Sequence, residues 1–303
     1  MRNRVLAVIL TSLLAISQTP THALHSLEKY VNSKNLASPG LLIINPTDGK
    51  VIAQNAPDSL RVPASVLKLI STTAALHFVG PDKTYTTSIY STDEANTYLI
   101  KGTLDPWLTS NLAQSKKNGQ KFLPSLVAKA NKENKKKITI YYSGLYEKDI
   151  FNLNINLKAK KIRATFKKVE SSEATALAKA EIAKLTSLPI SEMVKFVILW
   201  SDNTLADRLG KAAARKLGYE TDSKGLTQTF KQAMDELGID SSGMKVFDGS
   251  GLSKSNRVSA NTIVTLLSKI RNNPNFQSIY EGLPVGGITG TLQKRFLRLR
   301  HMQ

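Results

Sequence analysis

Hydrophobic and polar residues follow two different spacings along the chain, and the first of them is that of β-strands. Apolar runs at residues 40–45 and 50–54 flank the turn signal Pro46-Thr47-Asp48-Gly49. This arrangement predicts a β-hairpin over residues 40–54. An alternating pattern at residues 85–90 predicts a further strand.

The second spacing is helical, and it recurs in several segments. One helix is predicted from about Pro63 to Val79, because Pro suits a first helical turn and Gly80-Pro81 interrupts the pattern. Ser259 is the expected N-cap of a later helix. In all, the later part of the chain predicts four helices, at residues 191–200, 204–217, 227–237 and 259–271.

Between residues 91 and 185 the pattern changes. Short strand-like runs alternate there with stretches rich in Lys and Asn. We interpret this block as an inserted α+β subdomain within a domain built from residues 24–90 and 186–303. A chain of 303 residues is long enough for about two domains, which agrees with this division.

The first residues are typical of a secretory signal. Arg2 and Arg4 make a basic start, residues 5–16 are mostly apolar, and Thr21 and Ala23 place small residues before the expected cleavage point. The apolar run is too short to span a bilayer. We therefore expect residues 1–23 to be a signal peptide, the mature chain to have no transmembrane segment, and the protein to be periplasmic or extracellular.

Composition adds two constraints. The chain has no Cys, which excludes a disulfide and an anchor attached through Cys. Its 42 Lys and Arg residues against 23 Asp and Glu residues give a formal charge of +19. A solvated lysine-rich surface explains this excess, although attraction to an anionic polymer or membrane surface is an alternative. No nucleic-acid partner is expected, because the chain is exported and the lysines lack interleaved aromatic residues.

One short motif suggests nucleophilic chemistry. Ser65 and Lys68 form a Ser-x-x-Lys sequence at the predicted helix start, and residues three apart share a helix face. A serine hydroxyl needs a base, and a Lys serves as one only when burial or nearby positive charge lowers its pKa. Ser-x-x-Lys occurs three times in the chain, but only at Ser65 does a Pro precede it and an apolar helix follow it.

A second motif, Ser201-Asp202-Asn203, occurs once. A hydroxyl such as that of Ser201 can relay a proton, and an amide such as that of Asn203 can bond the backbone of a substrate. The simpler interpretation of the same residues is a turn that caps a helix. The two motifs together, in this order and in an exported chain, favour a serine enzyme of the penicillin-recognising type.

Several longer segments strengthen this interpretation. They resemble the D-alanyl-D-alanine carboxypeptidase/endopeptidase family of the penicillin-binding protein 4 type, over residues 26 to 296. The matching segments are residues 63–76, 102–106, 201–207, 248–253, 256–257, 283–287, 290–292 and 295–296. The later ones are more diagnostic than the two short motifs because they are long and ordered.

The resemblance implies an α/β (α+β) transpeptidase-like fold and a function. Ser65 would be the nucleophile that forms an acyl-enzyme with peptidoglycan stem peptides, and Lys68 would be its base. Ser201 and Asn203 would relay protons and place the substrate. β-Lactam antibiotics would be covalent inhibitors. Neither a metal nor a cofactor is implied.

The sequence also departs from the family. Its third motif, Lys-Thr-Gly, is absent from the 303 residues, and residues 297–303 are unlike the expected continuation. Residues 288–291 are Ile-Thr-Gly-Thr, but their flanking sequence matches the preceding family segment. The expectation is a truncated chain whose fold lacks its last sheet strands, with hairpin 40–54 isolated and activity impaired.

Two other functions stay open at this stage. One is a β-lactamase of the Ser-x-x-Lys type, although the long separation of Ser65 from Ser201 argues against a single-domain enzyme. The other is a non-catalytic remnant that binds peptidoglycan. No recognisable pattern indicates whether the enzyme removes terminal D-Ala or cleaves cross-links. Nor does any pattern indicate the oligomeric state or the type of cell envelope.

Overall fold

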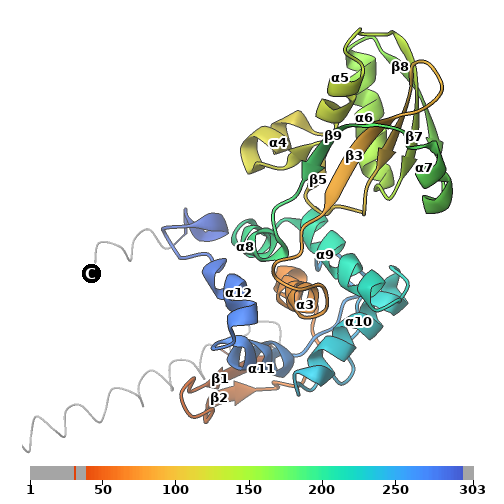
Figure 1. Cartoon of the computed structure of the whole chain (residues 1–303). Coiled ribbons are helices and arrows are strands. Elements are labelled where there is room, and N and C mark those ends of the chain that lie inside the picture. Colours follow the sequence, from red (N-terminus) through yellow and green to blue (C-terminus); the bar gives the residue numbers. More distant parts are fainter. Residues whose placement is uncertain (1–30, 32–38, 296–303) are drawn as a thin grey trace, which may run out of the picture.

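The computed structural model describes residue 31 and residues 39–295 (Figure 1). The predicted signal peptide, residues 1–23, and the unusual segment 297–303 lie outside the described residues. None of the helices within the described residues is long and apolar enough to cross a membrane.

A helical body surrounds α3 (Leu67–Ala74), whose side chains are nearly all buried. The 3-10 turn η1 (Ala64–Val66) precedes α3 and the π-helical turn η2 (Ala75–Val79) follows it, so the predicted helix at 63–79 is three consecutive segments. Gly80, at φ 97°, ends it. Helices packed around α3 share its apolar core: α8 (Ile190–Trp200), α9 (Asn203–Lys216), α10 (Ser223–Glu236), α11 (Ala260–Ile270) and α12 (Gln277–Glu281).

Two helix caps decide where the predicted helices begin. Ser259 accepts a hydrogen bond from the Thr262 N–H at 3.0 Å, which confirms it as the N-cap of α11. The predicted start of α10 at residue 227 was wrong by one turn. Asp222 accepts from the Gly225 N–H at 2.8 Å and starts the helix at Ser223.

The predicted hairpin is confirmed. Strand β1 (Leu41–Ile44) pairs antiparallel with β2 (Val51–Asn55), and β1 packs on α11. Among the described residues no third strand joins this pair. The segment that follows α12 continues as a connector with one short 3-10 turn, η4 (Gly290–Leu292).

The insert has its own sheet and its own core (Figure 1). Five strands lie in the order β8 (Arg163–Lys168), β7 (Lys137–Ser143), β4 (Thr97–Lys101), β3 (Thr86–Ser91) and β9 (Glu181–Thr186). Strands β4, β7 and β8 are parallel, whereas β3 is antiparallel to both of its neighbours. The remaining elements of the insert are β5 (Leu108–Thr109), α4 (Leu112–Asn118), β6 (Lys121–Phe122), α5 (Pro124–Ala130), α6 (Glu147–Ala159) and α7 (Ser171–Leu177).

The insert is therefore larger at its start than the predicted 91–185. Strand β3, which the sequence interpretation left in the outer domain, lies between β4 and β9 and is buried along residues 87–89. The sheet spans residues 86–186, because a strand with two partners belongs to the sheet that hydrogen-bonds it. Ser187 closes the stem of the insert, since its Oγ accepts from the Tyr85 N–H at 2.8 Å.

Asp105 is a buried carboxyl at the junction of the insert and α9. Its Oδ1 accepts from the Trp107 N–H at 2.8 Å, and its Oδ2 has no hydrogen-bond partner within the described residues. Burial raises the pKa of Asp105 to about 7, although the Trp107 hydrogen bond and the nearby Arg208 oppose the rise. The folded protein therefore keeps this carboxyl protonated at pH values where the unfolded chain ionises it.

This shift predicts a pH-dependent effect of Asp105→Asn on stability. Well below pH 4 the Asp105 carboxyl is protonated in both states, and its contribution to stability is lost as pH rises from about 4 towards 7. The variant does not titrate there, so its unfolding free energy should rise relative to wild type by on the order of 4 kcal/mol between pH 4 and 7.5. Urea unfolding at both pH values measures this, and an unchanged difference would contradict it.

Candidate active site

Ser65 and Lys68 lie side by side at the start of α3. Ser65 is exposed in the turn η1, whereas Lys68 is one turn further on and only 2% exposed. The Lys68 amine lies 3.0 Å from the Ser65 Oγ. The Ser-x-x-Lys spacing therefore places a buried amine against an accessible hydroxyl.

The Ser-Asp-Asn motif meets this pair from the connection between α8 and α9. Ser201 ends α8 in a left-handed conformation, at φ 56°, and its Oγ donates to the Ser65 Oγ at 3.0 Å. Asn203 begins α9, and its Oδ1 accepts from Lys68 at 2.7 Å. Between them, Asp202 caps α9 by accepting from the Leu205 N–H at 2.8 Å. The same motif therefore caps α9 and also brings Ser201 and Asn203 into contact with Ser65 and Lys68.

A third segment, which the sequence interpretation gave no role, completes the surroundings of Lys68. The backbone carbonyl of Ser250 accepts from the Lys68 amine at 2.8 Å. Because the acceptor is a backbone carbonyl, no particular residue type in the sequence indicates this contact. The run Asp248-Gly249-Ser250-Gly251 signals a tight turn, and that turn is the feature that brings this carbonyl to the amine.

Asp248 organises this turn through its carboxylate. It accepts from the N–H groups of Ser250, Gly251 and Ser253, each at 2.7 Å. Burial opposes ionisation, but hydrogen bonds from the Ser250 hydroxyl, from the Ser253 and Ser250 N–H groups and from the Asn256 side chain outweigh it and hold the pKa of Asp248 well below its usual range. The turn is thus fixed around a permanent negative charge at neutral pH.

Close backbone contact locks the turn to the nucleophile segment. A Cβ added to Gly251, which has φ +87°, would lie 1.7 Å from the Ala64 carbonyl oxygen. Ala64 itself is left-handed at φ 47°. The Ser71 Oγ donates to the Gly249 carbonyl at 2.7 Å from the next turn of α3. Only Gly fits where the two backbones meet.

Burial lowers the pKa of Lys68, and the charges of Asp248 and then Asp202 oppose this effect. The neutral amine has two N–H groups and one lone pair. When the N–H groups point to the Asn203 Oδ1 and the Ser250 carbonyl, the lone pair faces the Ser65 Oγ. The arrangement can therefore accept the Ser65 proton, while the Ser201 hydroxyl offers a second path for it.

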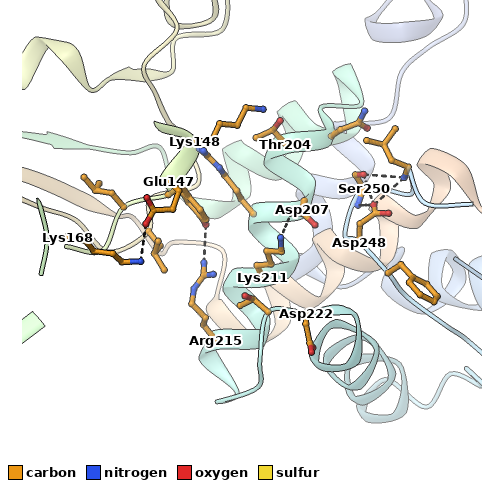
Figure 2. A pocket seen from close by; sticks show the side chains of 18 residues that line it. Glu147, Lys148, Lys168, Thr204, Asp207, Lys211, Arg215, Asp222, Asp248 and Ser250 are labelled. Atoms are coloured by element: carbon orange, nitrogen blue, oxygen red, sulfur yellow. Dashed lines mark hydrogen bonds and ion pairs between the residues drawn. The ribbon is translucent and has the colours of Figure 1, made fainter. Parts of the chain in front are cut away.

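A groove of about 820 Å³ begins beside this cluster. Figure 2 shows Glu147 and Lys168 on the insert side and Asp248 on the turn side, with Asp207 and Lys211 of α9 between them. Lys168 pairs with Glu147 at 3.0 Å, and Lys211 with Asp207 at 2.8 Å. Within residues 39–295 no group of three or more acidic, His or Cys side chains is placed to hold a metal ion.

The sequence matches one protein family along almost its full length. The match covers residues 23–138 and 125–303. The chain belongs to the D-Ala-D-Ala carboxypeptidase 3 (S13) family. The family expected from the motifs is thereby confirmed.

Curated relatives match over a shorter part. Carboxypeptidase DacB of Mycolicibacterium smegmatis is 31% identical over 118 residues, which are 38% of this chain and 26% of that protein. D-alanyl-D-alanine carboxypeptidase of Actinomadura sp. is 35% identical over 120 residues, 38% of this chain and 22% of that one. The chain thus matches about a quarter of the length of these curated relatives.

Solved structures of similar fold cover more of the chain. Penicillin binding protein 4 from Haemophilus influenzae superposes with a TM-score of 0.64 at 17% identity, covering 84% of this chain and 80% of that one. A predatory peptidoglycan endopeptidase from Bdellovibrio bacteriovorus gives 0.56 at 17% identity, with 84% and 77% covered. At this identity the likeness concerns the fold, and it confirms the predicted mixed α/β class.

The contact between Gly251 and Ala64 predicts a position-specific effect of Gly→Ala. Ala at a left-handed position costs roughly 1–2 kcal/mol by itself. Gly49, at φ +73° with nothing within 4 Å of an added Cβ, is the matched control. Gly251→Ala should lose clearly more unfolding free energy in urea than Gly49→Ala, because the turn must also move away from Ala64. Equal losses would contradict the contact.

Proposed function

We propose that the chain is a serine-type D-Ala-D-Ala carboxypeptidase or endopeptidase that acts on peptidoglycan stem peptides through Ser65. The observation that carries this proposal is the Lys68 amine, buried and 3.0 Å from the Ser65 Oγ. Membership of the S13 family and the likeness to penicillin binding protein 4 support it.

Acylation would begin when Lys68 accepts the Ser65 proton. The Ser65 Oγ then attacks the carbonyl carbon of the penultimate D-Ala, and the peptide C–N bond breaks. The leaving amine takes a proton from the Lys68 ammonium, with Ser201 as the relay that its 3.0 Å contact with Ser65 permits. Water hydrolyses the ester and restores the Ser65 hydroxyl.

Substrate placement would use Asn203 and the groove. The Asn203 Oδ1 holds Lys68, so its amide nitrogen is the group left to bond a substrate backbone. The groove starts at Asn203 and Ser250 and continues past α9 to the insert, so it offers the stem peptide a path away from Ser65. No metal or cofactor is needed for these steps.

β-Lactams would acylate the same serine. One structure of Haemophilus influenzae penicillin binding protein 4 is complexed with a β-lactam, and a Bdellovibrio bacteriovorus endopeptidase has been captured acylated by penicillin G. We further propose that residues 1–23 direct export to the periplasm or the cell exterior, where peptidoglycan and these antibiotics are met.

This chain alone should acylate slowly. Its 303 residues contain no Lys-Thr-Gly sequence, and no third strand joins β1 and β2 among the described residues. By the resemblance, that motif lies on a strand that contributes an oxyanion donor, and loss of one donor costs a factor of about 10²–10³ in rate.

Labelled penicillin tests the assignment of Ser65. Prolonged incubation of the full chain should give an adduct that mass spectrometry places on Ser65. Ser65→Ala should abolish it. Ser242→Ala is the matched control, because Ser242 and Lys245 form another Ser-x-x-Lys sequence. Label retained by Ser65→Ala, or its absence from folded wild type, would refute the proposal, and the second result would favour a non-catalytic binder.

A further inference from the structure

A buried arginine joins the active-site helix to the insert. Arg208 lies on α9, the helix that begins with Asn203, and its side chain is 7% exposed. Every partner of its guanidinium named below belongs to the insert. The sequence interpretation gave this residue no role.

The guanidinium uses both of its terminal nitrogens. Nη1 donates to the Leu108 carbonyl at 2.8 Å and to the Pro106 carbonyl at 3.3 Å. Nη2 donates to the Asp149 Oδ2 at 2.8 Å, and the Asp149 side chain is 5% exposed. The guanidinium also lies 4.1 Å from the centre of the Tyr146 ring. A planar guanidinium that donates several hydrogen bonds in this way fixes both the distance and the orientation of its partners, which a single point charge does not.

The opposite side of α9 is also held. At Gly210 an added Cβ would lie 2.9 Å from the Phe230 ring and 3.5 Å from the Ser71 Cβ, so α9 approaches α3 and α10 closely there. The helix therefore lies between α3, which carries Lys68, and the insert, which holds Arg208. The helix start carries Asn203, whose Oδ1 is 2.7 Å from the Lys68 amine.

We propose that Arg208 is a positioning residue for the reaction: by tying α9 to the insert, it holds Asn203 against the Lys68 amine. The rate effect rests on the proposed function, whereas the effect on Lys68 itself does not. The insert thereby becomes part of the catalytic architecture, although it supplies none of the groups that contact Ser65 in the described residues.

The titration of Lys68 separates positioning from simple structural support. The Asn203 Oδ1 accepts a hydrogen bond from the amine and so favours its charged form. Asp202, which caps the same helix, and Asp248 in the turn also favour that form. Displacement of α9 weakens the contributions of both Asn203 and Asp202 and also changes the burial of Lys68, so it shifts the Lys68 titration away from its wild-type pH. A residue that only stabilises the fold leaves this titration unchanged.

The variants must avoid leaving a buried charge unpaired. Arg208→Met alone would strand Asp149, so the test variant is Arg208→Met with Asp149→Leu, which replaces the ion pair with apolar groups of similar size. Arg208→Lys is the conservative variant, because it keeps the charge near Asp149 but loses the planar guanidinium. Arg215→Met is the control: Arg215 also lies on α9 and donates to the insert, to the Tyr146 hydroxyl at 3.1 Å, but far from Asn203.

Two measurements on the full chain decide the proposal. In ¹³Cε-lysine NMR, with Lys68 assigned through Lys68→Ala, the Lys68 of the double variant should titrate at a different pH from that of wild type. The Lys68 of Arg208→Lys should titrate between the two, and that of Arg215→Met should match wild type. The rate of Ser65 labelling by penicillin should decrease about 10- to 100-fold in the double variant. A folded double variant whose Lys68 titrates as in wild type overturns the proposal. The NMR result stands even if no variant is labelled, which would refute only the proposed function.

Discussion

The structure depends on the burial of one amine. Lys68 is almost entirely removed from solvent, and an uncompensated charge at such a position is costly. Three acceptors compensate it, and they come from residues 65, 203 and 250, three distant parts of the chain. The start of α3, the cap of α9 and the turn at Asp248 must therefore all be in place before the site exists. The same burial that imposes this requirement also lowers the pKa of Lys68 towards the range of a useful base.

The sequence predicted the side-chain members of this site because each belongs to a motif with fixed spacing. Ser65 and Lys68 are one helical turn apart, and Ser201 and Asn203 flank a capping Asp, so local geometry determines much of their arrangement. The Ser250 contact was not predictable in the same way. A carbonyl oxygen is present at every residue, and only the fold decides which one reaches an amine.

The fold, like the site, has features that local sequence determines and features that only long-range contacts determine. Hairpin 40–54 and the helix after Pro63 were predictable from turn residues and apolar spacing, which act locally. The start of the insert was not predictable, because the sequence of residues 86–91 is that of a strand that could belong to either domain. Only its pairing with β4 and β9 assigns it to the insert. Arg208 was missed for a related reason. A single Arg on a helix is typical of a solvated face, and only the approach of Asp149 and two backbone carbonyls makes it a buried one.

Two residues that flank the nucleophile, Ala64 and Ser201, occupy left-handed backbone conformations that side chains disfavour. Such conformations cost on the order of 1–3 kcal/mol each and persist only when their surroundings enforce them. The tight packing around α3 therefore maintains backbone strain next to Ser65, and this strain lowers the net stability of the fold. Glycine at either position would relieve the strain and stabilise the fold. At position 64 it would also loosen the backbone that holds Ser65, and at position 201 it would remove the Ser201 hydroxyl itself.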